Sequence, residues 1–132
     1  MYYVRIILKI LCVTFFFFKS ALCSEPIKIK HIRDAKLFET GDGRLISLSN
    51  VETFSIFDTD SLKKRMAKNV LRYAQQSLLN RSLILEFQYQ ADSIINVHLF
   101  EKVGLSRRSI NQHYLKRGFG YYIGFSVMMT NK

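Results

Sequence analysis

The sequence predicts a mainly β domain that also contains two helices. Residues 83–88 and 95–100 alternate apolar and polar side chains in the manner of half-buried strands. From Asp60 onward the apolar residues recur at helical spacing, and a shorter helical pattern begins at Ser109. The chain has 132 residues, of which 48% are hydrophobic and 23% charged. This length and composition exclude a disordered tail and a two-domain enzyme.

A hairpin is predicted ahead of the long helix. Residues 40–43 read Thr-Gly-Asp-Gly, which is the strongest turn signal in the chain because Gly and Asp adopt the backbone angles that tight turns need. This turn separates a strand over residues 35–39 from a second strand over residues 45–51. We therefore expect these two segments to pair with each other.

The long helix is predicted to begin at Asp60 or Ser61, because either side chain can accept hydrogen bonds from its first free amides. Its apolar residues recur every three or four positions, while basic residues line a different face. The apolar positions include Leu62, Met66, Val70 and Tyr73, and the basic positions are Lys64, Lys68 and Arg72.

A short helix is predicted over residues 109–117, capped by Ser109, with Ile110 and Tyr114 facing inward. Gly118 is placed to end this helix in the left-handed conformation. The expected order is three strands, a long helix, two strands and a short helix. Five strands with a helix after the third are typical of a small, partly open barrel of the OB type.

The amino terminus has the order of features that a secretory signal peptide needs. Residues 1–9 carry two basic residues and no acid, residues 10–18 are an uncharged run that is apolar except for Thr14, and small residues follow. We therefore expect residues 1–23 to be removed and residues 24–132 to form one secreted or periplasmic domain. The alternative is an uncleaved membrane anchor over residues 2–18, with Lys9 inside it.

The charge balance favours polyanionic partners. The chain carries 20 basic and 10 acidic residues, and residues 24–132 keep 17 of the basic residues and no cysteine. Nucleic acid and acidic lipid headgroups both suit such a surface, and a solvated basic surface is the alternative. Residues 106–109 are expected to form a turn that can hold an anion at the start of the short helix. The candidate polyanion-binding residues are Lys64, Lys68, Arg72, Arg107 and Arg108.

Three stretches resemble a known family in their order and spacing. Residues 32–52 resemble the opening hairpin of a staphylococcal-nuclease-like (thermonuclease-like) domain, with its D-G-D-T start and later R-L-x-G-I-D-x-P-E strand. Residues 78–81 resemble the end of the family's long helix. Residues 110–120 resemble its V-N-x-x-L-V-x-x-G-x-A segment without a gap, matching it at Asn111 and Gly118. The resemblance implies an OB-type barrel.

The resemblance also implies calcium-dependent phosphodiester hydrolysis, but the matching positions lack most of its chemistry. Asp34 and Glu52 match acidic positions, whereas Lys36 stands where the family has a metal-ligating Asp. An ammonium cannot ligate calcium and repels it. Ser47 and Ser55 replace a catalytic Arg and the catalytic Glu. We therefore expect an inactive family member with no cofactor and no metal.

Other chemistry has little support in the sequence. His31, His98 and His113 lack the short spacing of metal ligands, and we interpret them as structural or surface residues. The aromatic residues near the carboxyl end are better explained by packing than by base stacking, and they are Tyr114, Phe119, Tyr121, Tyr122 and Phe125.

Three functional hypotheses follow. The first is an exported, inactive module that binds nucleic acid, another polyanion or a protein. The second is a phosphodiesterase with a rearranged site, for which the candidate residues are Asp34, Arg44 and Glu52. The third is a structural envelope protein, attached to the membrane only if the amino-terminal segment is kept.

Overall fold

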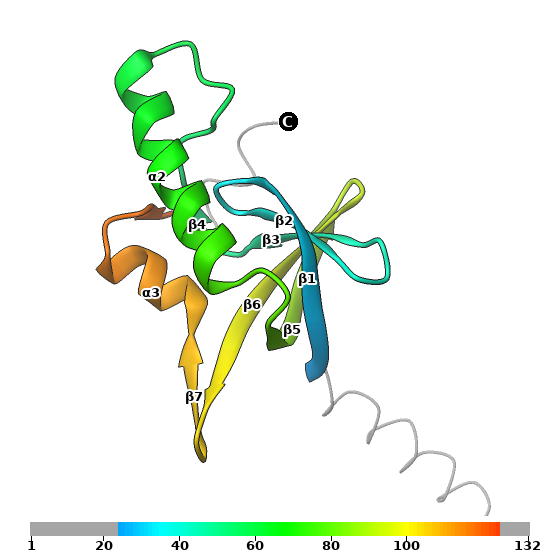
Figure 1. Ribbon diagram of the computed structural model, residues 1–132. Helices are drawn as coiled ribbons and strands as arrows, with labels where there is room; N and C mark the ends of the chain where they lie inside the picture. Colours follow the sequence, from blue (N-terminus) through cyan, green and yellow to red (C-terminus); the bar gives the residue numbers. More distant parts are fainter. Residues whose placement is uncertain (1–23, 125–132) are drawn as a thin grey trace, which may run out of the picture.

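The computed structural model describes residues 24–124, which form a curled sheet with two helices on it (Figure 1). The predicted signal peptide, the alternative anchor and Phe125 lie outside these residues. In chain order the elements are β1 (Ser24–Asp34), β2 (Leu37–Thr40), β3 (Leu45–Leu48), β4 (Val51–Glu52), α2 (Ser61–Ser77), β5 (Ser82–Ala91), β6 (Ile94–Val103), β7 (Ser106–Ser109), α3 (Ile110–Lys116) and β8 (Tyr121–Tyr122).

The main sheet has the strand order β3-β2-β1-β5-β6-β7, and its consecutive neighbours are antiparallel. The sheet curls so far that β3 also pairs with β6, in parallel. Separately, β4 pairs with β8 in a two-stranded sheet. The predicted class, mainly β with two helices, is confirmed.

The predicted hairpin is confirmed as β2 and β3. The Thr40 amide donates to the Arg44 carbonyl at 2.9 Å, and the Gly43 amide donates to the Thr40 carbonyl at 3.0 Å. Gly43 has φ of 86°, a left-handed conformation that glycine adopts without steric cost. Past the hairpin, the predicted strand over residues 45–51 is interrupted at Asn50, which itself has φ of 58°, so β3 and β4 are separate.

Both predicted helices are confirmed, together with their caps. Asp60 caps α2 by accepting hydrogen bonds from two amides of the first turn, and Ser109 accepts from the Gln112 amide at the start of α3. Gly118 follows α3 with φ of 69°. These local signals were sufficient because each cap acts within three residues of its own position.

The apolar stripe predicted for α2 is wrong in its first two turns. Leu62 is 54% exposed and Met66 is 41% exposed, whereas the buried residues of the helix begin at Ala67. The amino-terminal part of α2 projects beyond the sheet, and these two side chains are partly exposed there (Figure 1). Only the second half of α2 packs as the helical period predicts.

The turn predicted over residues 106–109 is also wrong, because these residues form strand β7. Gly104 has φ of 59° and reverses the chain two residues earlier. The strand then pairs with β6 in register, with Val103 opposite Ser106 and Phe100 opposite Ser109. Periodicity did not reveal this strand because none of its four residues is apolar.

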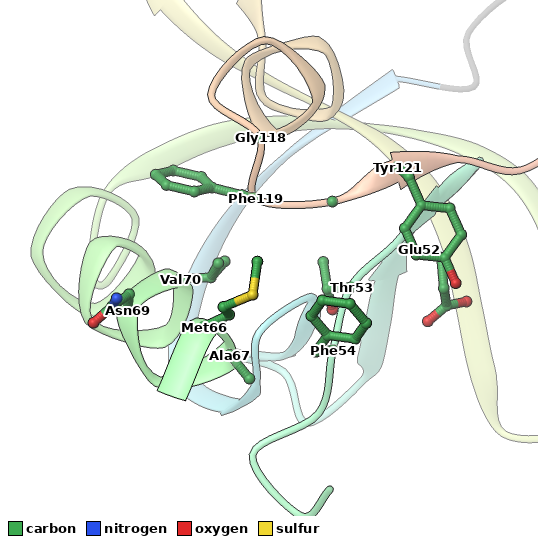
Figure 2. Close-up of a pocket in the computed structure, with 11 residues that line it drawn as sticks. Glu52, Thr53, Phe54, Met66, Ala67, Asn69, Val70, Gly118, Phe119 and Tyr121 are labelled. Carbon is green, nitrogen blue, oxygen red and sulfur yellow. The ribbon is translucent and has the colours of Figure 1, made fainter. Parts of the chain in front are cut away.

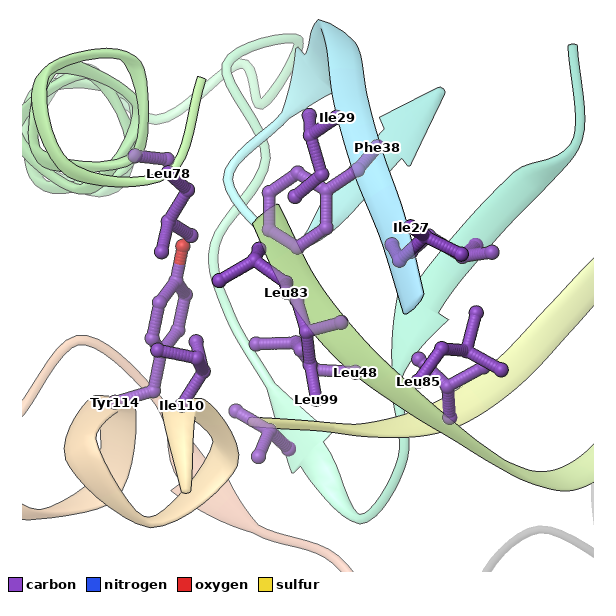
Figure 3. Close-up of a cluster of buried hydrophobic side chains, with 14 of the residues drawn as sticks. Ile27, Ile29, Phe38, Leu48, Leu78, Leu83, Leu85, Leu99, Ile110 and Tyr114 are labelled. Atoms are coloured by element: carbon purple, nitrogen blue, oxygen red, sulfur yellow. The ribbon is translucent and has the colours of Figure 1, made fainter. Parts of the chain in front are cut away.

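The core lies inside the curl of the sheet and is closed at one end by the helices (Figure 3). Leu83 and Leu85 of β5 enter it as the alternation predicts, but Phe87 is 46% exposed. Phe87 still pairs in register with Val97, and a register irregularity follows it, between Phe87 and Tyr89. The expected inward position of Phe87 is therefore not observed.

Two side chains of α3 tie the helix to the sheet. The buried amide of Asn111 accepts from the Leu99 amide at 2.9 Å and donates to the carbonyls of Ser49 at 3.0 Å and Val97 at 3.1 Å. The buried Tyr114 hydroxyl donates to the Ala35 carbonyl at 2.8 Å. Because these backbone groups belong to segments distant in sequence, α3 fixes how the segments meet.

Candidate functional site

The first candidate site is the region where the family resemblance places a metal ion. Here the Lys36 ammonium donates to the Glu52 carboxylate at 3.0 Å and to the Val51 carbonyl at 2.9 Å. Lys36 reaches β4 because it lies in the tight turn between β1 and β2. The positive charge at this site is therefore supplied by the protein itself, and Glu52 is its counterion. Burial and the negative charge of Glu52 both raise the pKa of the neighbouring Tyr89.

The carboxylate of Asp34 organises the backbone around it. One oxygen accepts from the Ala35 amide at 2.7 Å and from the Ile56 amide at 3.1 Å, and the other accepts from the Ser55 hydroxyl at 2.5 Å. These bonds hold the loop of residues 53–60 against the end of β1. Each oxygen of Asp34 thus has a protein partner, and Ser55, which stands where the family has its catalytic Glu, is one of them.

Arg44 lies at the other end of the hairpin. Asp34 is opposite Leu37 at one end of β2, whereas Arg44 follows the turn at the other end. Its guanidinium contacts Glu25 and donates to Asp42 at 2.9 Å. Hydrogen bonds from Thr40 and Arg44 lower the pKa of Asp42 to about 2. The structure therefore brings Glu52 and Lys36 together but leaves Arg44 apart from them.

The second candidate site is the outer face of α2. Lys64, Lys68 and Arg72 are all exposed and follow one another at intervals of four residues, so they lie along one side of the helix. The helix also carries Lys63 and Arg65 and contains no acidic residue. Within residues 24–124, none of these five cations forms an ion pair. We call Lys64, Lys68 and Arg72 the basic face.

The two arginines predicted to join this surface are instead engaged on the sheet. Arg107 pairs with Glu86 at 3.3 Å, and Arg108 pairs with Glu101. Both arginines are on β7, where the antiparallel pairing with β6 sets Arg108 opposite Glu101. Arg107 is opposite Lys102, and its side chain reaches Glu86 on β5, the strand beyond β6. Their charges are therefore partly neutralised, unlike those of the basic face.

The three histidines do not meet. Within residues 24–124 there is no group of three His, Cys, Asp or Glu side chains close enough to share a metal ion. His113 has a structural environment: its ring stacks on Tyr73 with centroids 5.3 Å apart. His98 contacts Phe100, and His31 is exposed.

His113 predicts a pH dependence of stability. Burial lowers its pKa below the ordinary value of 6.5, with help from the nearby charges of Arg108 and Arg117. Below pH about 6.5 the unfolded chain therefore binds a proton that the folded chain resists, so the free energy of unfolding decreases as the pH is lowered. We expect His113→Phe, which keeps the stacked ring, to remove this part of the pH dependence. Urea unfolding at several pH values checks it, and an unchanged dependence contradicts the assignment.

The candidate stacking aromatics divide between core and surface. Tyr114 is fully buried, and Phe119 packs against Tyr73 with ring centroids 4.9 Å apart. Tyr121 and Tyr122 are 55% and 64% exposed on the short strand β8. The first two therefore pack as expected, whereas the two tyrosines of β8 lie mostly in solvent.

A pocket of about 370 Å³ opens between α2, residues 52–54 and residues 118–121. Figure 2 shows Met66 pointing from α2 into this apolar pocket, between Phe119 on one side and Phe54 on the other. Gly120 lets the walls meet closely, because a Cβ there would lie 2.5 Å from the Glu52 carbonyl. No sequence pattern marks the pocket, since its lining comes from three separate segments.

No protein-family model and no curated protein matches this chain. Among residues 24–124, neither helix combines the length and the apolar character needed to span a membrane. The functional interpretation therefore depends on the side chains described above.

Proposed function

We propose that this protein is an exported, catalytically inactive thermonuclease-like domain of the OB type that binds polyanions. The parallel pairing of β3 with β6 supports a barrel, because it joins strands from opposite parts of the sheet order. The helix α2 follows the β2–β3 hairpin, and α3 follows the strands β5, β6 and β7. This order also agrees with that topology. Export rests on the sequence of residues 1–23.

The observation that carries the loss of catalysis is the Lys36–Glu52 ion pair. A divalent cation bound by Glu52 would stand beside an ammonium that already occupies this carboxylate, and like charges at such distances repel. Asp34 is committed to Ser55 and the Ile56 amide. Phosphodiester hydrolysis also needs groups that stabilise negative charge on the phosphoryl oxygens, and Arg44 is paired elsewhere. The location of Arg44, away from Glu52, argues against the alternative of a rearranged nuclease site.

The basic face supports polyanion binding. Each ion pair within residues 24–124 involves a cation outside α2, so the acidic residues neutralise the sheet and leave the helix positively charged. Two of the five α2 cations, Lys63 and Lys64, lie in its first turn, where the helix dipole disfavours positive charge. A fold that keeps cations at this unfavourable position gains from an anionic partner, although binding of a protein partner is compatible with the same surface.

The test incubates the mature domain with fluorescently labelled duplex DNA and calcium. We expect binding whose affinity falls linearly on a logarithmic salt scale, because phosphate contacts release counterions. We also expect no more DNA cleavage than in the same buffer without the protein. Calcium-dependent cleavage that is lost in Glu52→Ala would overturn the proposal and favour the nuclease. Absence of any salt-sensitive binding would equally overturn it.

A further inference from the structure

We propose that the apolar pocket binds a fatty carboxylate, with the alkyl chain inside the pocket and the carboxylate at its rim. This site is separate from the basic face, which lies on the outer side of α2, and the proposal does not depend on polyanion binding. The proposed fatty-carboxylate site is inferred from the apolar lining of the pocket, from two cations next to its aromatic residues, and from exposed apolar side chains that lead to it.

The lining suits an alkyl chain. Phe54, Met66, Val70 and Phe119 line the pocket with apolar side chains, and the cavity of about 370 Å³ falls within the usual range of small-molecule sites. Met66 lies in the middle of the pocket and is unbranched, so it can move to fit a flexible ligand (Figure 2). A ligand rich in polar atoms would find few partners here and would lose its hydrogen bonds to water.

Two cations next to aromatic residues of the pocket can attract a single negative charge. The Lys63 ammonium lies 5.6 Å from the centre of the Phe54 ring, and the Arg117 guanidinium carbon lies 5.8 Å from the centre of the Phe119 ring. Two aromatic walls of the pocket therefore each carry a cation. Within residues 24–124 neither cation forms an ion pair. The acid that lines the pocket, Glu52, is neutralised by its pair with Lys36.

An apolar path leads from the surface into the pocket. Leu62, one turn before Met66, is 54% exposed, and Met66 itself is 41% exposed while lining the cavity. Contiguous exposed apolar side chains often mark binding sites. Because Leu62 and Met66 are four residues apart, they lie on the same face of α2 and give an alkyl chain an apolar way to the pocket.

The test uses the full chain and monomeric dodecanoate in isothermal titration calorimetry. We expect saturable binding of one molecule, with affinity falling about four-fold for each methylene removed from the chain. Met66→Trp, which fills the cavity from a partly exposed position, should weaken binding at least ten-fold. Met66→Phe provides a smaller filling of the same space if the first variant unfolds.

The charge at the rim is tested with a neutral ligand of equal length. Lys63→Gln with Arg117→Gln should weaken dodecanoate binding about ten-fold and leave dodecanol binding unchanged. The matched control, Lys64→Gln with Lys68→Gln on the basic face, should change neither. No saturable binding by the folded protein, or equal binding by the Met66 variants, would overturn the proposal. Binding to anionic phospholipid vesicles without binding to monomeric dodecanoate would also overturn it, because it would indicate surface attachment through α2.

Discussion

Replacing Asn111 by alanine is expected to lower the free energy of unfolding by about 3 kcal/mol or more. The Asn111 side chain is buried and hydrogen-bonds to three backbone groups, on Leu99, Ser49 and Val97. Alanine leaves all three without this partner inside the protein, and each such loss costs about 1–3 kcal/mol. Urea unfolding of the wild type and the variant measures the difference.

The neighbouring Gln112 provides a matched control for that measurement. It is also an amide on α3, but its side chain is exposed, so Gln112→Ala should change the free energy of unfolding by less than about 0.5 kcal/mol. If Asn111→Ala unfolds within about 1 kcal/mol of the wild type, water or a rearranged backbone satisfies the three groups. The role of Asn111 as a tie between α3 and the sheet would then be wrong.

Neutralising the basic face is expected to lower the affinity for duplex DNA about 10- to 100-fold at low salt. Lys64→Gln, Lys68→Gln and Arg72→Gln together remove three exposed cations that lack ion-pair partners within residues 24–124. The slope of the logarithm of affinity against the logarithm of salt concentration should become shallower by about 2 to 3. Fluorescence anisotropy across a salt series measures both quantities.

The double variant Arg107→Gln with Arg108→Gln separates this surface from a general effect of charge. Both arginines are exposed, but they pair with Glu86 and Glu101, so their removal should reduce DNA affinity less per charge than removal of the α2 cations. A double variant that weakens binding more than the triple variant would place the polyanion site on β7. The prediction for the basic face would then be wrong.

Residue patterns along the chain predicted the features whose forces act over a few residues. The hairpin at Gly43, the caps at Asp60 and Ser109 and the end of α3 at Gly118 depend on backbone angles and on hydrogen bonds to nearby amides. These were located correctly. Strand β7 was missed because its residues are polar, and its pairing with β6 provides the only signal for it.

The amino-acid sequence by itself determined that a lysine stands at position 36, that α2 carries cations without acids, and that two helices interrupt a mainly β chain. Only the tertiary structure decided that Lys36 reaches Glu52, that Arg44 does not, and that Phe54, Met66 and Phe119 enclose one pocket. The physical reason is that such contacts join segments far apart along the chain. Their geometry depends on how the sheet curls and on where the helices pack, which local periodicity does not encode.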